Sequence, residues 1–395
     1  MKRKFNNKNI IAIIFVGFIV ICGILTFTLN PTRILGGLVR GYLDAPEESN
    51  VLQRAGSAFK SFEGRMSQYF AFHDASIHAY GGVQRLLGRN LIDDTDKSSM
   101  VLKLDNGYLT FKQNTDIDLT SLKDYLIKLK ATCDASNSEL LYVHKASKDT
   151  TDETLLPDFY PYAHSLNFNK IKPELENNGI NILDLQTVIK EQNLNKYSLF
   201  FKTDHHWTPK TGIWVSQNIV NKLNQTLNWN LDTDVFNIEN FNIKTYEQCF
   251  LGSQGKRIGA LYSGLDDFDV ITPKFETDYV VEMRDTSTKV SGDFAKTMLF
   301  EDAITPDNIL NKDNTAYATY LGGNHDFIRM TNNKVKNGKK AVLILDSFGC
   351  VVAPYLSLPF EQLDCIDIRG NSLSVEDYIK ENSPDAVIYM IIQHQ

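Results

Sequence analysis

Hydrophobic and polar positions divide the chain into an apolar amino-terminal run and a longer, mixed remainder. From Ile10 to Leu29, twenty consecutive residues carry no charge, which is about the length that crosses a ~30 Å hydrocarbon core. Four basic residues and no acidic one stand among the first nine, so the positive-inside rule places the amino terminus in the cytoplasm and the rest outside. A cleaved signal peptide is the alternative, although the run has no convincing small-x-small cleavage site. We predict a cytoplasmic tail over residues 1–9 and a single-pass signal anchor over residues 10–29.

The pattern changes twice more before residue 100. Residues 30–50 contain a proline, a pair of glycines and an acidic patch, which are typical of a connector. From Val51 to Leu91, large apolar residues recur at three- and four-residue steps, and this spacing predicts helix. We therefore predict a juxtamembrane linker and amphipathic helices over residues 30–99. The apolar stripe contains Phe59, Phe62, Met66, Tyr69 and Phe70.

From residue 100 to residue 395, alternating helical and β patterns predict an extracellular α/β domain. The segment MVLKLDNGYLTF, from Met100 to Phe111, is typical of a hairpin with Asn106 and Gly107 at its turn. Helix-then-strand patterns follow, and short β-branched runs return near the carboxyl terminus. This order predicts a parallel sheet with strands buried on both faces. The predicted helices are 119–133 and 169–176, and the predicted strands are 140–144, 180–185, 341–346, 362–368 and 386–392.

Residues from about 229 to 339 have a different character. This stretch is rich in Asn, Asp and Thr, and it contains alternating segments such as TDYVVEMRD and HDFIRMTNN. Alternation of apolar and polar residues is typical of strands with one buried face. We predict a β-rich insertion or subdomain here, between two halves of the α/β domain.

Composition and charge exclude some classes of protein. The chain has 395 residues, of which 43% are hydrophobic and 23% charged, and this excludes a disordered chain. The formal net charge is −7, and the residues after the basic tail sum to −11. A general nucleic-acid binder normally carries a basic face, so we expect no nucleic-acid partner. The five cysteines lack the short spacing of a metal knuckle, so we expect no zinc site.

The first segment with candidate chemistry is KTDHHWTPKTG. Thr208 followed by Pro209 predicts a helix start, because a cap residue precedes a proline at the first helical position. The Asp and His residues therefore lie in a loop before a helix, and loops between strands and helices are where α/β folds place reactive groups. Asp204 stands two residues before His206, so it can orient that imidazole and stabilise its protonated form.

The second segment is VLILDSFG, in which Ser347 follows a predicted buried strand. A serine at the carboxyl end of a strand, with Gly349 two residues on, can project its hydroxyl into a crevice while the following backbone N–H groups face an oxyanion. Ser347 is not in a Gly-x-Ser-x-Gly elbow, so an α/β-hydrolase does not fit. Taken alone, such a serine is often a helix cap, and the Asp-His-His run could be a solvated turn. Together the two segments supply the three roles of a serine triad.

These segments also resemble a known family. TDHHWT is similar to the Asp-x-His-Trp signature of SGNH-hydrolase-like polysaccharide O-acetyltransferases of the AlgX/AlgJ type, and more closely to their Gram-positive DHHW relatives. DSFG resembles the nucleophile block of that family, and FLGSQGKRIG, YLGGNHDF and CIDIR resemble its other landmarks. The likeness runs from about residue 100 to the end. It implies a flavodoxin-like, SGNH-type parallel sheet with permuted motif order, since ordinary SGNH enzymes place Ser before Asp-x-x-His.

Carried over by position, the resemblance implies a role for each residue of the two motifs. Ser347 would accept the acyl group, His206 would be the base and Asp204 would orient it. His205 occupies the variable position and is expected to be structural, and Trp207 is expected to pack under the histidine loop. One departure is the leucine at position 345, where such hydrolases have glycine before Asp-Ser.

Two further assignments concern oxygen binding. Gly323 and Asn324, in GGNHD, could complete an oxyanion hole, or they could form a plain glycine turn. Arg369, directly after a predicted strand, could contact substrate oxygens, or it could make a surface salt bridge. The sequence leaves both choices open.

The expected activity is transfer of an acetyl group, through a serine acyl-enzyme, to hydroxyls of a cell-surface or secreted polysaccharide. The resemblance implies a separate multi-pass membrane O-acyltransferase that supplies the acetyl group, and no cofactor. A carbohydrate esterase with the same triad, and a non-catalytic glycan-binding scaffold, are alternatives. A metal-dependent DHH-type phosphoesterase is another, and it would need further ligands upstream, of which Asp116 and Asp118 are the compact candidates.

Overall fold

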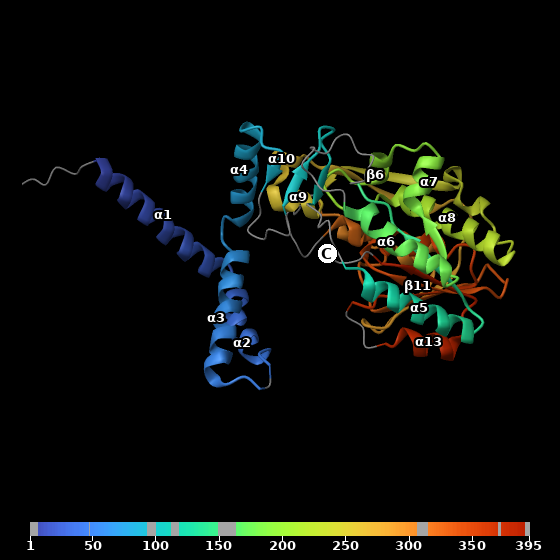
Figure 1. Ribbon diagram of the computed structural model, residues 1–395. Helices are drawn as coiled ribbons and strands as arrows, with labels where there is room; N and C mark the ends of the chain where they lie inside the picture. Colours follow the sequence, from blue (N-terminus) through green and yellow to red (C-terminus); the bar gives the residue numbers. More distant parts are fainter. Residues whose placement is uncertain are drawn as a thin grey trace, which may run out of the picture. The chain divides into compact units, whose positions relative to one another are not determined.

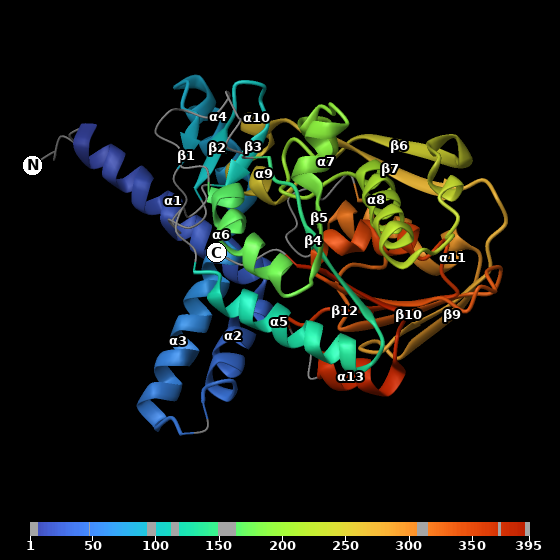
Figure 2. The same cartoon turned by 45° about the vertical axis from the view of Figure 1, so that its right-hand side comes forward.

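The computed structural model describes residues 7–46, 48–92, 100–111, 118–148, 163–305, 315–369 and 373–391. Within it the chain divides into two compact units, Met1–Val83 and Gln84–Gln395. Figures 1 and 2 show the chain from two sides.

The first unit is helical. Its helices are α1 (Asn7–Leu29), α2 (Pro31–Leu43), α3 (Val51–Gln68) and most of α4 (His73–Leu86). Within α1, the predicted apolar run is long and apolar enough to cross a membrane, and only 11% of it is buried. A signal sequence near an amino terminus passes the same test, so the helix is consistent with a signal sequence or a single membrane anchor. Helices α2 and α3 approach closely at Gly41, where an added Cβ would lie 2.6 Å from the Ser57 carbonyl oxygen.

The second unit contains an eight-stranded sheet with the order β5-β4-β13-β11-β12-β10-β8-β9. The first five strands in this order are parallel, and the last three pair antiparallel. The largely parallel sheet predicted from the sequence is therefore confirmed. The parallel strands are β4 (Glu139–His144), β5 (Asn181–Asp184), β11 (Lys340–Leu345), β12 (Gln362–Ile366) and β13 (Ala386–Met390).

The parallel strands are buried on both faces because alternate side chains enter two different cores. In β11, Val342 and Ile344 pack into one core, and Leu343 and Leu345 pack into the other. The first core is covered by α5 (Thr120–Ala135), α6 (Ala163–Asn177) and α13 (Val375–Asn382). The second is covered by α8 (Pro209–Leu227) and α12 (Ala353–Leu356). In Figure 2, α5 and α13 lie on one side of the sheet and α8 on the other.

The stretch between the two motifs is rich in strands, and most of these strands belong to the central sheet rather than to a separate subdomain. Three of its strands extend the central sheet, because their inward residues, such as Val281 and Met330, pack into the same core as α8. Two other strands pair only with each other in a ribbon. The three are β8 (Tyr279–Met283), β9 (Thr288–Gly292) and β10 (Phe327–Asn332), and the two are β6 (Phe241–Phe250) and β7 (Asp266–Pro273).

A small antiparallel sheet lies at the start of the second unit. It contains the predicted hairpin, with β2 (Val101–Lys103) paired to β3 (Leu109–Phe111), and β1 (Leu91–Ile92) on the other side of β2. Gly107 has a φ of 85° at the turn, a conformation that glycine adopts readily. One face of this sheet packs against α9 (Ser253–Ile258) and α10 (Ala260–Ser263).

The remaining short elements connect the sheet and its helices. They are α7 (Leu185–Glu191), η2 (Lys196–Leu199), η3 (Asp234–Phe236), η4 (Ile238–Asn240), α11 (Phe294–Met298), η5 (Glu301–Ala303), η7 (Ala316–Thr319) and η8 (Ser347–Val351).

Candidate active site

Ser347 opens the 3₁₀ turn η8 directly after the central strand β11 and Asp346. Asp346 caps this turn, since its Oδ1 accepts a hydrogen bond from the Phe348 N–H at 3.0 Å. The Gly349 N–H also donates to the Asp346 carbonyl, at 2.8 Å. Both backbone N–H groups that were expected to face an oxyanion are therefore used inside the turn, and this part of the prediction is wrong.

The Asp-His-His-Trp segment forms a loop that ends at Thr208, the N-cap of α8. The loop is closed by an isolated bridge between Phe200 and Trp207, and by a 3.2 Å hydrogen bond from the Phe201 N–H to the His206 carbonyl. It follows η2 rather than a strand of the central sheet, which corrects the expectation that it lies at a strand end. The helix start at Pro209 agrees with the sequence.

The fold brings the two motifs together across 141 residues of sequence. His206 Nδ1 lies 2.6 Å from Asp204 Oδ1, and His206 Nε2 lies 2.8 Å from Ser347 Oγ. Since the carboxylate can only accept, Nδ1 carries the proton and Nε2 is available to accept the serine proton. This hydrogen-bonded chain is the arrangement that a serine nucleophile and its general base require.

The Asp204 carboxylate is 4% exposed and has a donor on each oxygen. Oδ1 also accepts from the His206 N–H at 2.8 Å, and Oδ2 accepts from the Ser253 N–H at 2.5 Å. Burial raises the pKa of Asp204, but the charges of His206 and His205 and these hydrogen bonds outweigh it and hold the pKa well below the ordinary value. Asp204 is therefore ionised at neutral pH.

Gly252 allows the Asp204 loop to approach α9. An added Cβ at Gly252 would lie 2.1 Å from Asp204 Cβ, so a larger residue does not fit here. The Gly252 N–H donates to Thr203 Oγ at 2.8 Å, and the Thr203 hydroxyl donates in turn to Asp266 at 2.5 Å. These contacts hold the loop against the start of α9 and against β7.

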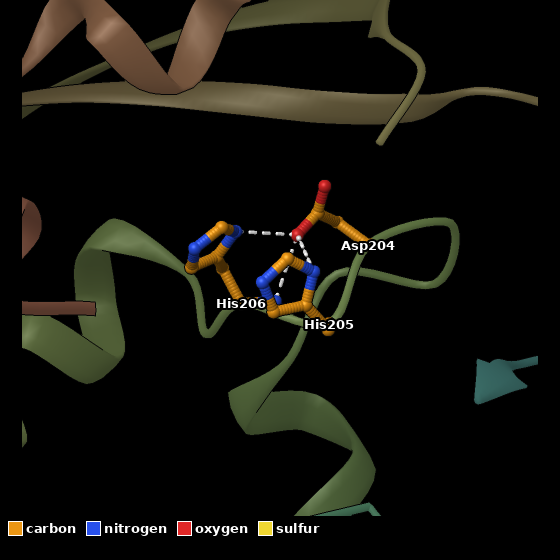
Figure 3. A group of neighbouring side chains, drawn as sticks. All are labelled: Asp204, His205 and His206. Atoms are coloured by element: carbon orange, nitrogen blue, oxygen red, sulfur yellow. Dashed lines mark hydrogen bonds and ion pairs between the residues drawn. The ribbon is translucent and has the colours of Figure 1, made fainter. Parts of the chain in front are cut away.

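His205 faces Ser253 and the ring of His206. Its Nδ1 lies 2.6 Å from Ser253 Oγ and 3.3 Å from Asp204 Oδ1, and its ring centroid is 3.8 Å from that of His206. Burial and the neighbouring His206 hold the pKa of His205 below its usual range. Figure 3 shows both imidazoles beside one carboxylate oxygen.

The Asp204, His205 and His206 side chains also offer three ligand atoms within 4.8 Å of one another. A cation would have to compete with the backbone N–H donors that occupy both Asp204 oxygens. Of the further ligands that a DHH-type metal site would need, Asp118 lies two residues before the start of α5, where its Oδ1 accepts from the Thr120 N–H at 2.9 Å. Asp116 lies outside the described residues.

Aromatic residues enclose the His206 imidazole. The Tyr317 ring stacks on it at 4.3 Å between centroids, and the Phe348 ring lies at 4.7 Å. Trp207 is buried, packs edge-on against Phe348 and donates from Nε1 to the Phe348 carbonyl at 2.9 Å. Trp207 therefore joins the histidine loop directly to the turn that carries Ser347.

Gly323, Asn324 and Arg369 are the residues that the sequence suggested for oxygen binding. Gly323 and Asn324 lie beside the nucleophile turn, with the Cys350 thiol 3.5 Å from the Gly323 carbonyl and 3.4 Å from Asn324 Oδ1. The Gly323 N–H donates to the Tyr320 carbonyl, at 3.2 Å, so it is turned away from an oxyanion role, whereas Asn324 is exposed. The Arg369 guanidinium makes two hydrogen bonds to the Asp367 carboxylate. This contact is a salt bridge, the alternative to substrate contact that the sequence left open.

Four residues of the site carry no signal in the sequence that nominates them. Ser253 belongs to the FLGSQGKRIG segment, but nothing in that segment indicates a contact with Asp204. Tyr317 lies in a stretch without a motif. Lys145 and Lys148 follow β4 and are buried at the site, although lysines in a sequence normally indicate solvated surface.

Comparisons with known proteins identify the families that parts of the chain match. Residues 108–252 match the family model described as the SGNH hydrolase-like domain of acetyltransferase AlgX, and residues 185–366 match the DHHW protein family. Both matches confirm the resemblance carried by the motifs.

Solved structures share the fold at low sequence identity. PatB1 from Bacillus cereus, solved with a sulfonyl adduct, has a TM-score of 0.61 and 20% identity over 77% of this chain and 95% of that one. A DHHW family protein from Eubacterium siraeum has a TM-score of 0.57 and 17% identity over 77% of this chain and 93% of that one. No curated protein matches the sequence significantly.

Proposed function

Because this chain carries an SGNH hydrolase-like domain related to AlgX and to the DHHW family, we propose that it is a serine-dependent O-acetyltransferase. The single observation that carries the proposal is the unbroken hydrogen-bonded chain from Asp204 through His206 to Ser347. An ionised carboxylate, an oriented imidazole and a hydroxyl in this order activate a serine for acyl transfer.

The first half-reaction loads the enzyme. His206 Nε2 removes the Ser347 proton as Oγ attacks the acetyl carbonyl of the donor. The bond between that carbonyl and the donor's leaving group then breaks, the leaving group takes the proton from His206, and an acetyl ester remains on Ser347. Asp204 stabilises the imidazolium that forms in between.

The second half-reaction unloads it onto the acceptor. An acceptor hydroxyl gives its proton to His206 as its oxygen attacks the Ser347 ester. The ester bond to Oγ breaks, Oγ takes the proton back, and the acceptor leaves as an O-acetyl ester. With water as the acceptor, the same steps release acetate, so a carbohydrate esterase differs from a transferase only in what enters at this point.

The acceptor and the donor are part of the same proposal, which the site and the apolar helix support. We propose that the acceptor is a cell-surface or secreted polysaccharide, since it offers the hydroxyls that the second step needs. The donor is a multi-pass membrane O-acyltransferase that delivers acetyl groups to the outside, and α1 anchors this chain beside it with its amino terminus in the cytoplasm. No cofactor is needed in either step.

The test is mass spectrometry of the full-length protein after exposure to an acetyl ester donor. We expect an acetyl adduct on Ser347 that is absent from the His206→Ala variant. Adding an oligosaccharide acceptor should discharge the adduct into acetylated sugar. Release of acetate at a rate that no acceptor changes would favour the esterase.

Two further experiments test for a metal-dependent phosphoesterase and for a scaffold without activity. An activity that is lost with a chelator but survives in Ser347→Ala would overturn the proposal in favour of the phosphoesterase. Unchanged polysaccharide acetylation in a strain that carries Ser347→Ala would favour the non-catalytic scaffold. A sulfonyl fluoride provides an independent probe, since it forms a stable adduct only with an activated nucleophile.

A further inference from the structure

Two buried lysines follow strand β4 within four residues. Lys145 is 2% exposed and Lys148 is 3% exposed. Burying an ammonium group costs several kcal/mol unless it is well paired, so the role of each lysine is to be read from its partners. The partners of these two lysines belong to different halves of the Asp-His-Ser chain.

Lys145 holds the turn that carries Ser347. Its Nζ donates to Asp346 Oδ2 at 2.6 Å and lies 4.3 Å from the centroid of the Phe348 ring. Asp346 uses its other oxygen to cap the same turn. The ammonium therefore fixes the residues on both sides of the serine.

Lys148 holds the loop that carries Asp204 and His206. Its Nζ donates to the carbonyl oxygens of Asp204 at 2.5 Å and Phe201 at 3.0 Å. It also reaches the Leu109 carbonyl at 2.6 Å and Gln254 Oε1 at 3.1 Å. One ammonium thus ties the loop to β3 and to α9, the helix that also binds Asp204 through Ser253.

We propose that Lys145 and Lys148 act as a pair of positioning residues that set the distance between Ser347 Oγ and His206 Nε2. This inference rests on the proposed function. Both lysines lie in one short segment at the end of β4, so that segment connects the nucleophile turn and the base loop. One ammonium, that of Lys145, contacts the turn that carries Ser347, and the other, that of Lys148, contacts the loop that carries Asp204 and His206.

Positioning predicts a particular dependence on His206. Displacing the serine from the imidazole by about 1 Å costs on the order of 10²-fold in rate, because base assistance requires the hydrogen bond to be in place. Once His206 is absent, there is no assistance left to lose. The effect of each lysine on turnover should therefore disappear in the His206→Ala background, as expected for residues that act as a unit.

The experiment measures kcat and KM of the full-length protein for acetyl transfer from a small ester donor. Lys145→Met would remove the ammonium that pairs with the buried Asp346 carboxylate, so it is made as Lys145→Met/Asp346→Asn, which keeps the capping oxygen. Lys148→Met is made alone, because the contacts of its Nζ with Leu109, Phe201, Asp204 and Gln254 end on neutral oxygens. We expect each to lower kcat 10- to 100-fold with KM within threefold, and to cause no further loss beside His206→Ala.

The matched control is Lys128→Met, because Lys128 is an exposed lysine paired with Glu376 on the surface. We expect it to leave kcat unchanged. Far-ultraviolet circular dichroism and thermal unfolding establish that each variant is folded. Lys145→Gln/Asp346→Asn and Lys148→Gln serve as second variants that retain a hydrogen-bond donor.

Three results would overturn the proposal. They are kcat within twofold of wild type in the folded variants, an equal fold-loss with and without His206, or failure of all these variants to fold, which would assign the lysines to stability. If His206→Ala itself leaves turnover unchanged, the proposed function fails instead, and the two failures are distinguishable.

Discussion

Asp–His pairs recur in the second unit, and comparing two of them, His144–Asp184 and His206–Asp204, shows what makes one a candidate site. His144 Nδ1 lies 2.9 Å from Asp184 Oδ1, and His206 Nδ1 lies 2.6 Å from Asp204 Oδ1. In both pairs burial raises the pKa of the carboxyl group, and the histidine together with the other neighbouring donors and charges more than offsets this effect. The pKa of Asp184 is thereby lowered to about 2, and that of Asp204 is held well below its ordinary value.

The surroundings of the two pairs differ. His144 and Asp184 end the neighbouring parallel strands β4 and β5, so the sheet itself brings them together. The His144 ring stacks on Phe168 at 3.7 Å, and the Thr187 hydroxyl donates to Asp184. Neither contact places a nucleophile on the imidazole. An Asp–His hydrogen bond is thus a common structural unit, and Ser347 on the far side of the second imidazole is what distinguishes that pair.

The largest predicted effect comes from removing the Ser347 hydroxyl, the group that distinguishes the two pairs. Ser347→Ala should lower acetyl transfer at least about 10³-fold, because the acyl group then has no oxygen to bind. Sulfonyl fluoride labelling, followed by mass spectrometry, should fall to background in the same variant. The thermal unfolding temperature should change little, since the side chain is small and only partly buried.

A labelled peptide that contains another residue would contradict this prediction. Ser253 is the matched control, because its hydroxyl contacts His205 rather than His206. Ser253→Ala keeps the backbone N–H that binds Asp204 and should retain full labelling of Ser347.

The second prediction compares the two carboxylates directly. Asp204→Asn should lower kcat about 10²- to 10⁴-fold, because an amide does not hold the imidazole in the required tautomer or stabilise its protonated form. Asp184→Asn should leave kcat within twofold of wild type. Steady-state kinetics on both variants, with unfolding temperatures to show that each is folded, make the measurement. Equal losses of kcat would mean that the difference between the pairs does not lie in Ser347.

Some elements of the fold are predictable from the sequence, and others are not. The central strands are predictable because their β-branched runs need no partner to be recognised, and the start of α8 is predictable from Thr208 and Pro209 alone. The pairing of β8 and β10 with the central sheet is not predictable in this way. Alternation of apolar and polar residues indicates that a strand has one buried face, but it does not indicate which strand lies beside it. Strand pairing of this kind depends on contacts far apart in sequence.

The site divides in the same way. The residue types and spacing of Asp204 and His206 are sufficient to nominate them, and the serine is nominated by its position after a strand. The sequence does not nominate Lys145 and Lys148, because the burial of a lysine depends on the packing around it and not on its neighbours in sequence. The prediction for the N–H groups of the nucleophile turn is wrong because both donate to Asp346, the first to its side chain and the second to its backbone carbonyl oxygen.

The third prediction tests the close packing of Gly252 against Asp204, the carboxylate of the His206 pair. Gly252→Ala should destabilise the protein by about 1–3 kcal/mol and lower kcat about tenfold or more, since the new methyl group overlaps Asp204 Cβ and must displace it. Gly56→Ala is the control, because nothing lies within 4 Å of a Cβ at that helical position. Urea unfolding and kinetics on both variants make the measurement, and a loss of stability with unchanged kcat would show that the loop tolerates the shift.

The smallest predicted effect is a pH-dependent contribution of the structural pair to stability. The lowered pKa of Asp184, about 2 against an ordinary value near 4, contributes about 2 kcal/mol to the free energy of unfolding. The contribution is present in full above about pH 5, where the carboxylate is ionised in both states. As pH falls from about 5 towards 2, the unfolded chain takes up the proton first, so the contribution is progressively lost.

Calorimetry of wild type and Asp184→Asn between pH 6 and pH 2.5 measures this contribution. We expect the variant to unfold a few degrees lower at pH 6, and the two unfolding temperatures to converge as the pH approaches 2.5. Asp124→Asn, at an exposed ion pair, should unfold with the wild type throughout. A gap between wild type and Asp184→Asn that stays constant with pH would mean that the asparagine removes packing or capping rather than a charge interaction, and the two Asp–His pairs would then differ in electrostatics as well as in what faces the imidazole.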